Sequence, residues 1–178
     1  MSEQPIVPKE IRKIYEGRVF TVQIETIVPR GGGQVELEII RHPGSVVLVP
    51  ITETGMVVLV RQYRHAAARW AWELPGGSLE AGEDVREAAI RECHEEIGLI
   101  PSRLEPLGAF FPTPGYCDEE MHFFRATGLR PPGPTDEAAA QDEDEDIETR
   151  AFTLNEIRSM IAAREIVDLK SLVGLTFL

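Results

Sequence analysis

A capped helix over residues 85–97 is the feature of this sequence that most constrains its fold. Asp84 supplies a good N-cap with Glu87 three residues later, and Gly98 supplies a stop at the C-terminal end. An apolar stripe at helical spacing is formed by Val85, Ala89, Cys93 and Ile97. Because such a stripe has to be buried, we expect this helix to pack against a β-sheet.

Three carboxylates occupy another face of the same helix. Glu92, Glu95 and Glu96 stand at i, i+3 and i+4, so their side chains project from one turn. A face relieved by Arg91 and exposed to solvent would explain them structurally, although like charges this close repel. Hard divalent cations, in contrast, require several carboxylate oxygens converging from rigid supports. From the helix alone, a solvated acidic face and a metal site both stay open.

The rest of the chain reads mainly as short strands, which favours a mixed α/β fold. Strands are expected at residues 18–28, 34–40, 45–51, 56–62, 72–74, 107–111, 120–126 and 147–152, and helices at 153–163 and 169–175. Turn residues at 31–33 and 52–55 predict two hairpins, the first of them an N-terminal antiparallel strand pair. The strands of the second hairpin are apolar throughout, so we expect both of their faces to be buried. The acidic run at 142–146 is expected to be a solvated connection.

Composition narrows the classes of function. The chain has 178 residues and a net charge of −12, from 18 Lys and Arg against 30 Asp and Glu, which disfavours binding to nucleic acid. Its apolar runs fall short of the roughly 20 residues that cross a bilayer, so we expect no membrane association. Two cysteines and an N-terminus without a secretory pattern indicate a reducing, cytoplasmic setting.

The stretch from residue 77 to residue 99 resembles the Nudix box. That pattern is Gly, five residues, Glu, seven residues, Arg-Glu, an aliphatic, any residue, Glu-Glu, any residue, Gly and an aliphatic. It is filled here by Gly77, Glu83, Arg91, Glu92, Cys93, Glu95, Glu96, Gly98 and Leu99. Cys93 departs from the usual aliphatic, but a buried thiol packs as a small hydrophobe, so we expect the chemistry to be unaffected.

The resemblance implies the Nudix fold, an α/β (mixed α+β) arrangement in which a mixed β-sheet is sandwiched between helices. It also implies hydrolysis of a nucleoside diphosphate linked to another group. Glu83 and Arg91 are then expected to pair with each other and hold the loop against the helix.

The resemblance also implies a metal site. Glu92 and Glu96 would bind Mg²⁺ together with the carbonyl oxygen of Gly76, and Glu95 would join them or orient a water. Mn²⁺ is an alternative to Mg²⁺. A glycine at position 76 suits this role because the backbone can turn sharply there and bring its carbonyl near the acidic face.

Further segments are similar to the ADP-ribose pyrophosphatase branch of this family. They are residues 60–64, 72–77, 114–119, 142–145 and 165–168. The branch implies hydrolysis of ADP-ribose, or a related nucleoside diphosphate sugar, to a nucleoside monophosphate and a sugar phosphate. It also places the general base at Glu119, with Glu95 on the helix as the other candidate. The Arg common before Glu38 in the branch is Leu37 here, which leaves the preferred sugar nucleotide open.

Two other residues are candidate substrate ligands. Arg64, just past a strand end, can make a bidentate contact to phosphate or ribose oxygens, and its alternative is a surface ion pair. Glu73 can accept hydrogen bonds from an adenine amino group or a ribose hydroxyl, and its alternative is a paired carboxylate on an edge strand. For both residues the two interpretations stay open.

We expect residues 1–44 to form a strand region that makes a dimer and residues 45–178 to form the Nudix hydrolase domain. A strand pair standing alone would leave unpaired edges and an apolar face, which proteins usually cover. The resemblance implies that relatives cover them by exchange across a two-fold axis, giving a homodimer whose chains both line each pocket. Two alternatives to this enzyme are a Nudix domain that senses nucleotide sugars without cutting them and a hydrolase of other nucleoside polyphosphates.

Overall fold

The computed structural model describes residues 5–134, 136 and 146–178. Its strands are β1 (Glu10–Glu16), β2 (Thr21–Ile27), β3 (Val35–Arg41), β4 (Ser45–Pro50), β5 (Val57–Arg64), β6 (Arg69–Glu73), β7 (Ile100–Phe110), β8 (Met121–Arg130) and β9 (Glu148–Phe152). Its helices are α1 (Val85–Ile97), α2 (Leu154–Ala162), α3 (Leu169–Leu175) and a 3₁₀ turn, η1 (His65–Ala67). In the acidic run predicted to be a solvated connection, residues 142–145 lie outside the described part of the chain.

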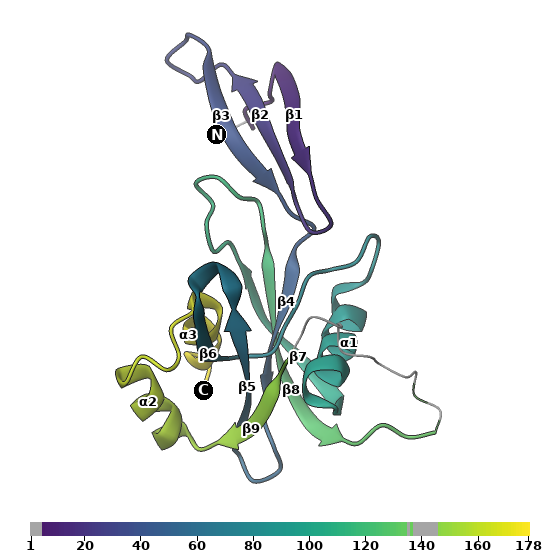
Figure 1. Ribbon diagram of the computed structural model, residues 1–178. Coiled ribbons are helices and arrows are strands. Elements are labelled where there is room, and N and C mark those ends of the chain that lie inside the picture. The colour runs from purple at the N-terminus through teal and green to yellow at the C-terminus, as the bar shows by residue number, and fades with distance from the viewer. Residues whose placement is uncertain (1–4, 135, 137–145) are drawn as a thin grey trace.

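A sheet formed by the N-terminal strands stands apart from a larger body (Figure 1). In the described residues the strand orders are β1-β2-β3 for this N-terminal sheet, and β4-β8-β7 and β6-β5-β9 for the body. β4 runs parallel to β8, whereas β7 with β8 and β5 with β6 and β9 are antiparallel. Helix α1 covers one side of the body sheets, and α2 and α3 cover the other. The predicted mixed sheet between helices is therefore confirmed.

The central strands of the body are buried on both faces, as predicted. Val46 and Leu48 of β4 join a core cluster with α1, while Val47 and Val49 join a second cluster with α2. β5 divides its side chains between the same two clusters in the same alternating way. Cys93 is fully buried in the first cluster, and burial raises its pKa to about 12, so this thiol packs as an apolar group. Alternation along each strand thus joins both helical layers to one framework.

The hairpin predicted for residues 45–51 and 56–62 is wrong. Their turn forms, and the two strands meet at a bridge between Ile51 and Val57. Beyond it they diverge, because β4 takes β8 as its partner and β5 takes β6 and β9. Strands that are apolar on both faces can be buried between two helical layers while they belong to separate sheets, so the turn between them does not fix their pairing.

Two other strand predictions needed extension. The predicted N-terminal pair is confirmed as β2 and β3, but a third strand, β1, was not predicted. Every residue of β1 is exposed, so its sequence carries no buried alternation to reveal it. β7 begins at Ile100 rather than at 107, and its register shifts between Pro106 and Gly108. Prolines at 101 and 106 hid this strand from the sequence pattern, because proline is normally confined to bulges and edges.

The helix ends follow the predicted caps. The Asp84 side chain accepts from the backbone N–H of Arg86 at 2.8 Å, and α1 stops at Gly98, whose φ of 69° suits glycine. Thr153 and Glu156 form the predicted capping box of α2. None of the helices in the described part of the chain is long and apolar enough to cross a bilayer.

Candidate active site

A polar cavity of about 820 Å³ opens between the β1–β2 turn of the N-terminal sheet and the loop that leads into α1. Its lining residues are Glu16, Gly17, Arg18, Val19, Phe20, Thr21, Arg41, Pro43, Arg64, Gly76, Gly77, Ser78, Leu79, Glu80, Ala81, Arg91, Glu92, Glu95 and Glu96. The structure therefore brings the predicted metal ligands and Arg64 to one cavity. Glu73 and Glu119, the other two predicted site residues, lie outside that lining set.

The two glycines before α1 fit because other groups approach their backbone closely. A Cβ atom at Gly76 would overlap the carbonyl oxygen of Val46, and one at Gly77 would overlap the Glu92 carboxylate. The Gly76 N–H donates to Oε2 of Glu96 at 2.7 Å. The Val46 N–H donates to the Gly77 carbonyl oxygen at 2.9 Å, which ties the loop to β4. Glycine is thus required by the contact of this loop with the sheet and with the acidic face of α1.

Arg91 is the hub of the acidic face. Its Nε and Nη2 donate to the two oxygens of Glu83 at 2.8 and 2.9 Å, and Nη2 also donates to the carbonyl oxygen of Ser78 at 3.2 Å. Its Nη1 donates to Glu92 at 2.7 Å and to Glu95 at 2.8 Å. These contacts raise the pKa of Arg91, and hydrogen bonding to Arg91 lowers the pKa of Glu83. The predicted pairing of Glu83 with Arg91 is confirmed.

The acidic residues that line the cavity suit a hard divalent cation by their chemistry. Glu92 and Glu96 are 8% and 4% exposed, and with Glu95 they line the cavity beside Gly76. Carboxylate and carbonyl oxygens are the ligands such a cation takes. Within the described residues, no three acidic, histidine or cysteine side chains converge closely enough to form a ready-made metal site. The cationic partner of Glu92 and Glu95 is the Arg91 guanidinium instead.

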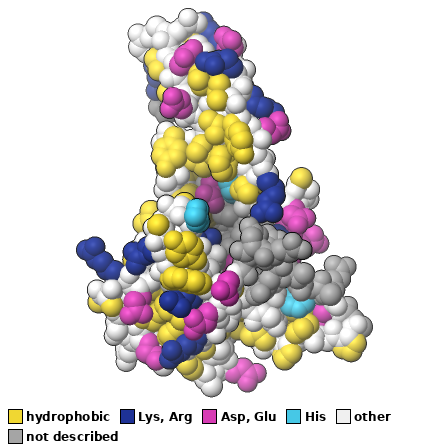
Figure 2. Space-filling view, in the orientation of Figure 1, with side chains coloured by type: hydrophobic (Ala, Val, Ile, Leu, Met, Phe, Trp, Pro, Cys, Tyr) yellow, Lys and Arg dark blue, Asp and Glu magenta, His cyan; other side chains and the backbone are white. Residues whose placement is uncertain are grey.

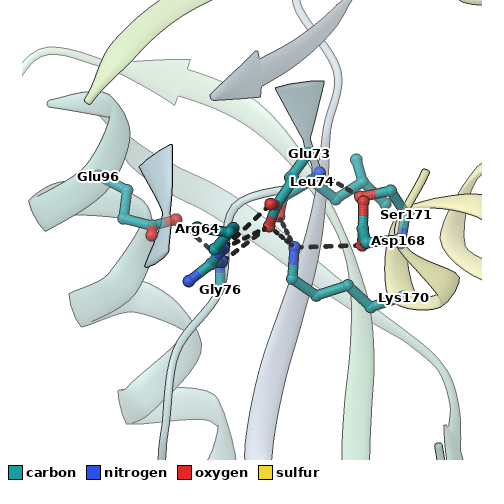
Figure 3. A network of polar contacts seen from close by, with 8 residues as sticks. All are labelled: Arg64, Glu73, Leu74, Gly76, Glu96, Asp168, Lys170 and Ser171. Carbon is teal, nitrogen blue, oxygen red and sulfur yellow. Dashed lines mark hydrogen bonds and ion pairs between the residues drawn. The ribbon is translucent and has the colours of Figure 1, made fainter. Parts of the chain in front are cut away.

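Arg64 and Glu73 form an ion pair with each other (Figure 3). Nε of Arg64 lies 3.0 and 3.1 Å from the two Glu73 oxygens, and Nη2 lies 2.7 Å from Oε2. Glu73 is 2% exposed, and burial raises its pKa, but hydrogen bonding to Arg64 and the charge of Lys170 outweigh burial and lower it. Glu73 therefore lies behind Arg64, whose guanidinium is at the cavity wall.

Glu119 lies beside the first residue of β4. Ser45 Oγ donates to Oε1 of Glu119 at 2.9 Å. The preceding residue, Asp118, accepts from Nη1 of Arg41 at 2.9 Å, and Arg41 also pairs with Glu25 of the N-terminal sheet, which is 5% exposed. Through these contacts the loop that carries Glu119 is fixed to the junction between the N-terminal sheet and the body.

Several residues that the structure places at the site were not predicted from the sequence. Arg41 and the turn at 16–21 line the cavity although both belong to the N-terminal region. Lys170 contacts Glu73 from α3 at 2.7 Å. The similarity at residues 165–168 ended two positions before Lys170 and was the nearest indication in the sequence. Nothing in the sequence pattern marked Arg41.

The fold and this glycine–carboxylate cavity define an enzyme of the Nudix pyrophosphohydrolase class. A match to the NUDIX domain spans residues 41–170, and the chain belongs to that family. Within the family it falls in the ADP-ribose pyrophosphatase branch, since relatives of that name are 32% identical to it over nearly its whole length.

Relatives cover nearly the whole chain. The chain is 32% identical over 176 residues to the ADP-ribose pyrophosphatase of Bacillus subtilis (strain 168), covering 99% of this chain and 92% of that protein. It is 36% identical over 166 residues to the methanol dehydrogenase activator of Bacillus methanolicus, covering 93% and 88%. A crystal structure described as an ADP compounds hydrolase has a TM-score of 0.81 at 23% identity, covering 99% of this chain and 93% of the other, and supports the fold.

Proposed function

We propose that this protein hydrolyses the pyrophosphate bond of ADP-ribose or a related nucleoside diphosphate sugar, releasing a nucleoside monophosphate and a sugar phosphate. The observation that carries the proposal is the joint cavity of Glu92, Glu95, Glu96 and Arg64, which combines carboxylates for a cation with a guanidinium for an anion. The relatives named ADP-ribose pyrophosphatase support this choice of substrate, since they match nearly the entire chain.

In this proposal Glu92, Glu96 and the carbonyl oxygen of Gly76 hold Mg²⁺, and Glu95 joins them or orients a water. Mn²⁺ is the alternative ion. When bound, a divalent ion offsets the charge of the pyrophosphate and polarises its phosphorus. Arg91, which pairs with Glu92 and Glu95, keeps these side chains in place through its contact to the loop. An acidic protein can thus bind an acidic substrate at this one cavity.

Glu119 is the proposed general base, and Glu95 is the other candidate. The hydrogen bond that Ser45 donates fixes one carboxylate oxygen of Glu119, and the Glu119 side chain stays partly exposed. Glu119→Gln should lower kcat strongly and leave metal affinity largely unchanged, because a base acts in the chemical step. A silent Glu119→Gln together with a damaging Glu95→Gln would assign the base to the helix instead.

Arg64 and Glu73 are the proposed substrate-binding pair. Arg64 is the member that reaches the cavity, and its planar guanidinium suits bidentate contact to phosphate oxygens. Glu73 orients that guanidinium through the hydrogen bonds at Nε and Nη2. The fixed orientation lowers the cost of ordering Arg64 when substrate binds.

We also propose a cytoplasmic homodimer in which residues 1–44 form the dimerising region and residues 45–178 the hydrolase domain. Support comes from the exposed apolar side chains of the N-terminal sheet and from the free thiols of Cys93 and Cys117. Light scattering at low micromolar concentration should give twice the chain mass, with an interface above roughly 1,000 Å². A monomeric mass together with full turnover would contradict the proposed dimer.

The decisive experiment is a panel of nucleoside diphosphate sugars incubated with Mg²⁺, with EDTA as the control and mass spectrometry of the products. AMP and ribose 5-phosphate should appear from ADP-ribose with Mg²⁺ and be lost in EDTA. Tight binding without cleavage would favour the ligand-sensing alternative. Cleavage restricted to dinucleoside polyphosphates would favour the other hydrolase class.

A further inference from the structure

Lys170 of α3 reaches the ion pair behind the cavity from the opposite side of the body (Figure 3). Its Nζ lies 2.7 Å from Oε2 of Glu73 and 3.0 Å from the carbonyl oxygen of Leu74. It also lies 3.4 Å from Oδ1 of Asp168, the N-cap of α3. The Lys170 side chain is only 12% exposed, so these are part-buried, charge-assisted contacts rather than surface ones.

Helix α3 holds Lys170 in this position through a second contact to the same backbone. The Leu74 N–H donates to Oγ of Ser171 at 2.7 Å, and Ser171 is fully buried. Leu74 is thus bound on its N–H by Ser171 and on its carbonyl by Lys170. Because both backbone groups of the buried Leu74 are hydrogen-bonded to α3, the position of α3 relative to the end of the strand that carries Glu73 is fixed.

The charges alternate along this network. Arg64 is positive and lines the cavity, Glu73 is negative and buried behind it, and Lys170 is positive and part-buried behind Glu73. Both cations share Oε2 of Glu73. If Lys170 lost its charge, Arg64 alone would have to neutralise a carboxylate that is 2% exposed, and the positive field reaching the cavity would fall.

We propose that Lys170 is a positioning residue for substrate binding, which shares the charge of Glu73 so that the group of Arg64, Glu73 and Lys170 keeps a net positive charge for the anionic pyrophosphate. The inference rests on the proposed function, because it concerns how that substrate is bound. Glu73 then acts through Arg64, whose Nε and Nη2 donate to the carboxylate, which assigns the remaining nitrogen, Nη1, to the substrate in this proposal.

The test compares Lys170→Met with the double variant Glu73→Gln/Lys170→Met. Methionine keeps the length of the side chain and removes only its charge and donors. The double variant removes one positive and one negative group, so the charge around Arg64 returns to that of the wild type. Arg158→Met on the exposed surface of α2 is the matched control, with the same charge change away from the cavity.

For Lys170→Met we expect KM for ADP-ribose with Mg²⁺ to rise about tenfold and kcat to change less than about threefold. The KM of the double variant should be at least about threefold lower than the KM of Lys170→Met. Calorimetry of ADP-ribose binding in EDTA should rank the proteins in the same order. Arg158→Met should match the wild type. A purely structural role would instead make the double variant as poor as Lys170→Met or poorer.

Two outcomes separate this inference from the proposed function. If wild-type protein cleaves ADP-ribose and Lys170→Met keeps its KM within twofold, Lys170 has no positioning role and the proposed function stands. If wild-type protein neither binds ADP-ribose in EDTA nor cleaves it with Mg²⁺, the proposed function is wrong and this inference falls with it.

Discussion

Strands β3 and β4 have similar aliphatic content but differ in burial. β4 has every residue buried, because each of its faces meets one of the two core clusters. β3 carries Val35 and Leu37 at 43% and 38% exposed, and β1 adds Ile11, Ile14 and Tyr15, each more than half exposed. Figure 2 shows the hydrophobic side chains gathered over the N-terminal sheet. The body covers its own strands, whereas the N-terminal sheet presents an apolar surface of the kind that marks an interaction site.

The contacts that join the N-terminal sheet to the body differ in kind from the contacts that hold the body together. The body is held by apolar packing across both of its helical layers. The N-terminal sheet meets the body through polar contacts, in which Arg41 links Glu25 to Asp118 and the N–H of Ile40 donates to the Tyr116 carbonyl at 2.7 Å. Burial therefore fixes the body, and a few directed bonds orient the sheet that closes the cavity.

The first prediction compares core packing in the two regions. Leu48→Ala should lower the free energy of unfolding by about 2–5 kcal/mol, because it leaves a cavity at a fully buried position. Leu37→Ala, the matched truncation in the N-terminal sheet, should cost under about 0.5 kcal/mol in a dilute sample. Urea denaturation of both variants measures the contrast. Equal losses at every protein concentration would mean that Leu37 is already covered within one chain.

The second prediction tests whether chemistry belongs to the body. Glu96→Gln should reduce turnover at least ~100-fold while folding stays intact, because it removes a charge from the cavity but keeps an acceptor for the Gly76 N–H. Glu87→Gln, on an exposed face of the same helix, is the control and should keep full turnover. Kinetics at saturating Mg²⁺ decide the matter. Near wild-type turnover of Glu96→Gln would exclude that residue from the site.

The third prediction concerns the junction. Arg41→Met should destabilise the N-terminal sheet by about 1–3 kcal/mol, because it leaves the Glu25 carboxylate, 5% exposed, without this partner. Hydrogen exchange should speed up in β2 and β3 and stay unchanged in β4 and β5. Lys13→Met, which breaks an exposed pair with Glu16, should change neither region measurably. Faster exchange throughout the body would show that the two regions unfold together.

The smallest expected effect is a pH dependence within the body. The pKa of Glu73 is below its ordinary value of 4.5, so the unfolded chain takes up this proton more readily than the folded one. The stabilisation that Glu73 contributes is present above pH 4.5 and is lost as the pH falls through the folded pKa. Urea denaturation between pH 7 and 3 should show a flatter acid slope for Glu73→Gln. Glu148→Gln, on an exposed pair of β9, should keep the wild-type slope.

Local spacing was sufficient wherever the relevant residues lie within one or two turns of each other. The limits of α1 and the capping box of α2 followed from the sequence, because caps depend on nearby residues. The carboxylate face of α1 followed from the spacing of i, i+3 and i+4 neighbours. The Glu83–Arg91 pair, whose members are eight positions apart, was expected from the resemblance to the Nudix box. The resemblance to the Nudix box then supplied the family, since its pattern lies entirely within this local segment.

Pairings between residues far apart in the chain, in contrast, depended on the tertiary structure. β4 pairs with β8 rather than with β5, the next strand in the sequence. The exposed β1 pairs with β2, although the sequence pattern of β1 did not predict a strand. Arg41 meets Asp118 across 77 positions, and Lys170 meets Glu73 across 97. Spacing along a chain carries no information about such contacts, because they depend on which strands pair and where each helix docks. The sequence therefore determined the acidic helix, and the topology determined which cations face it across the cavity and which stand behind it.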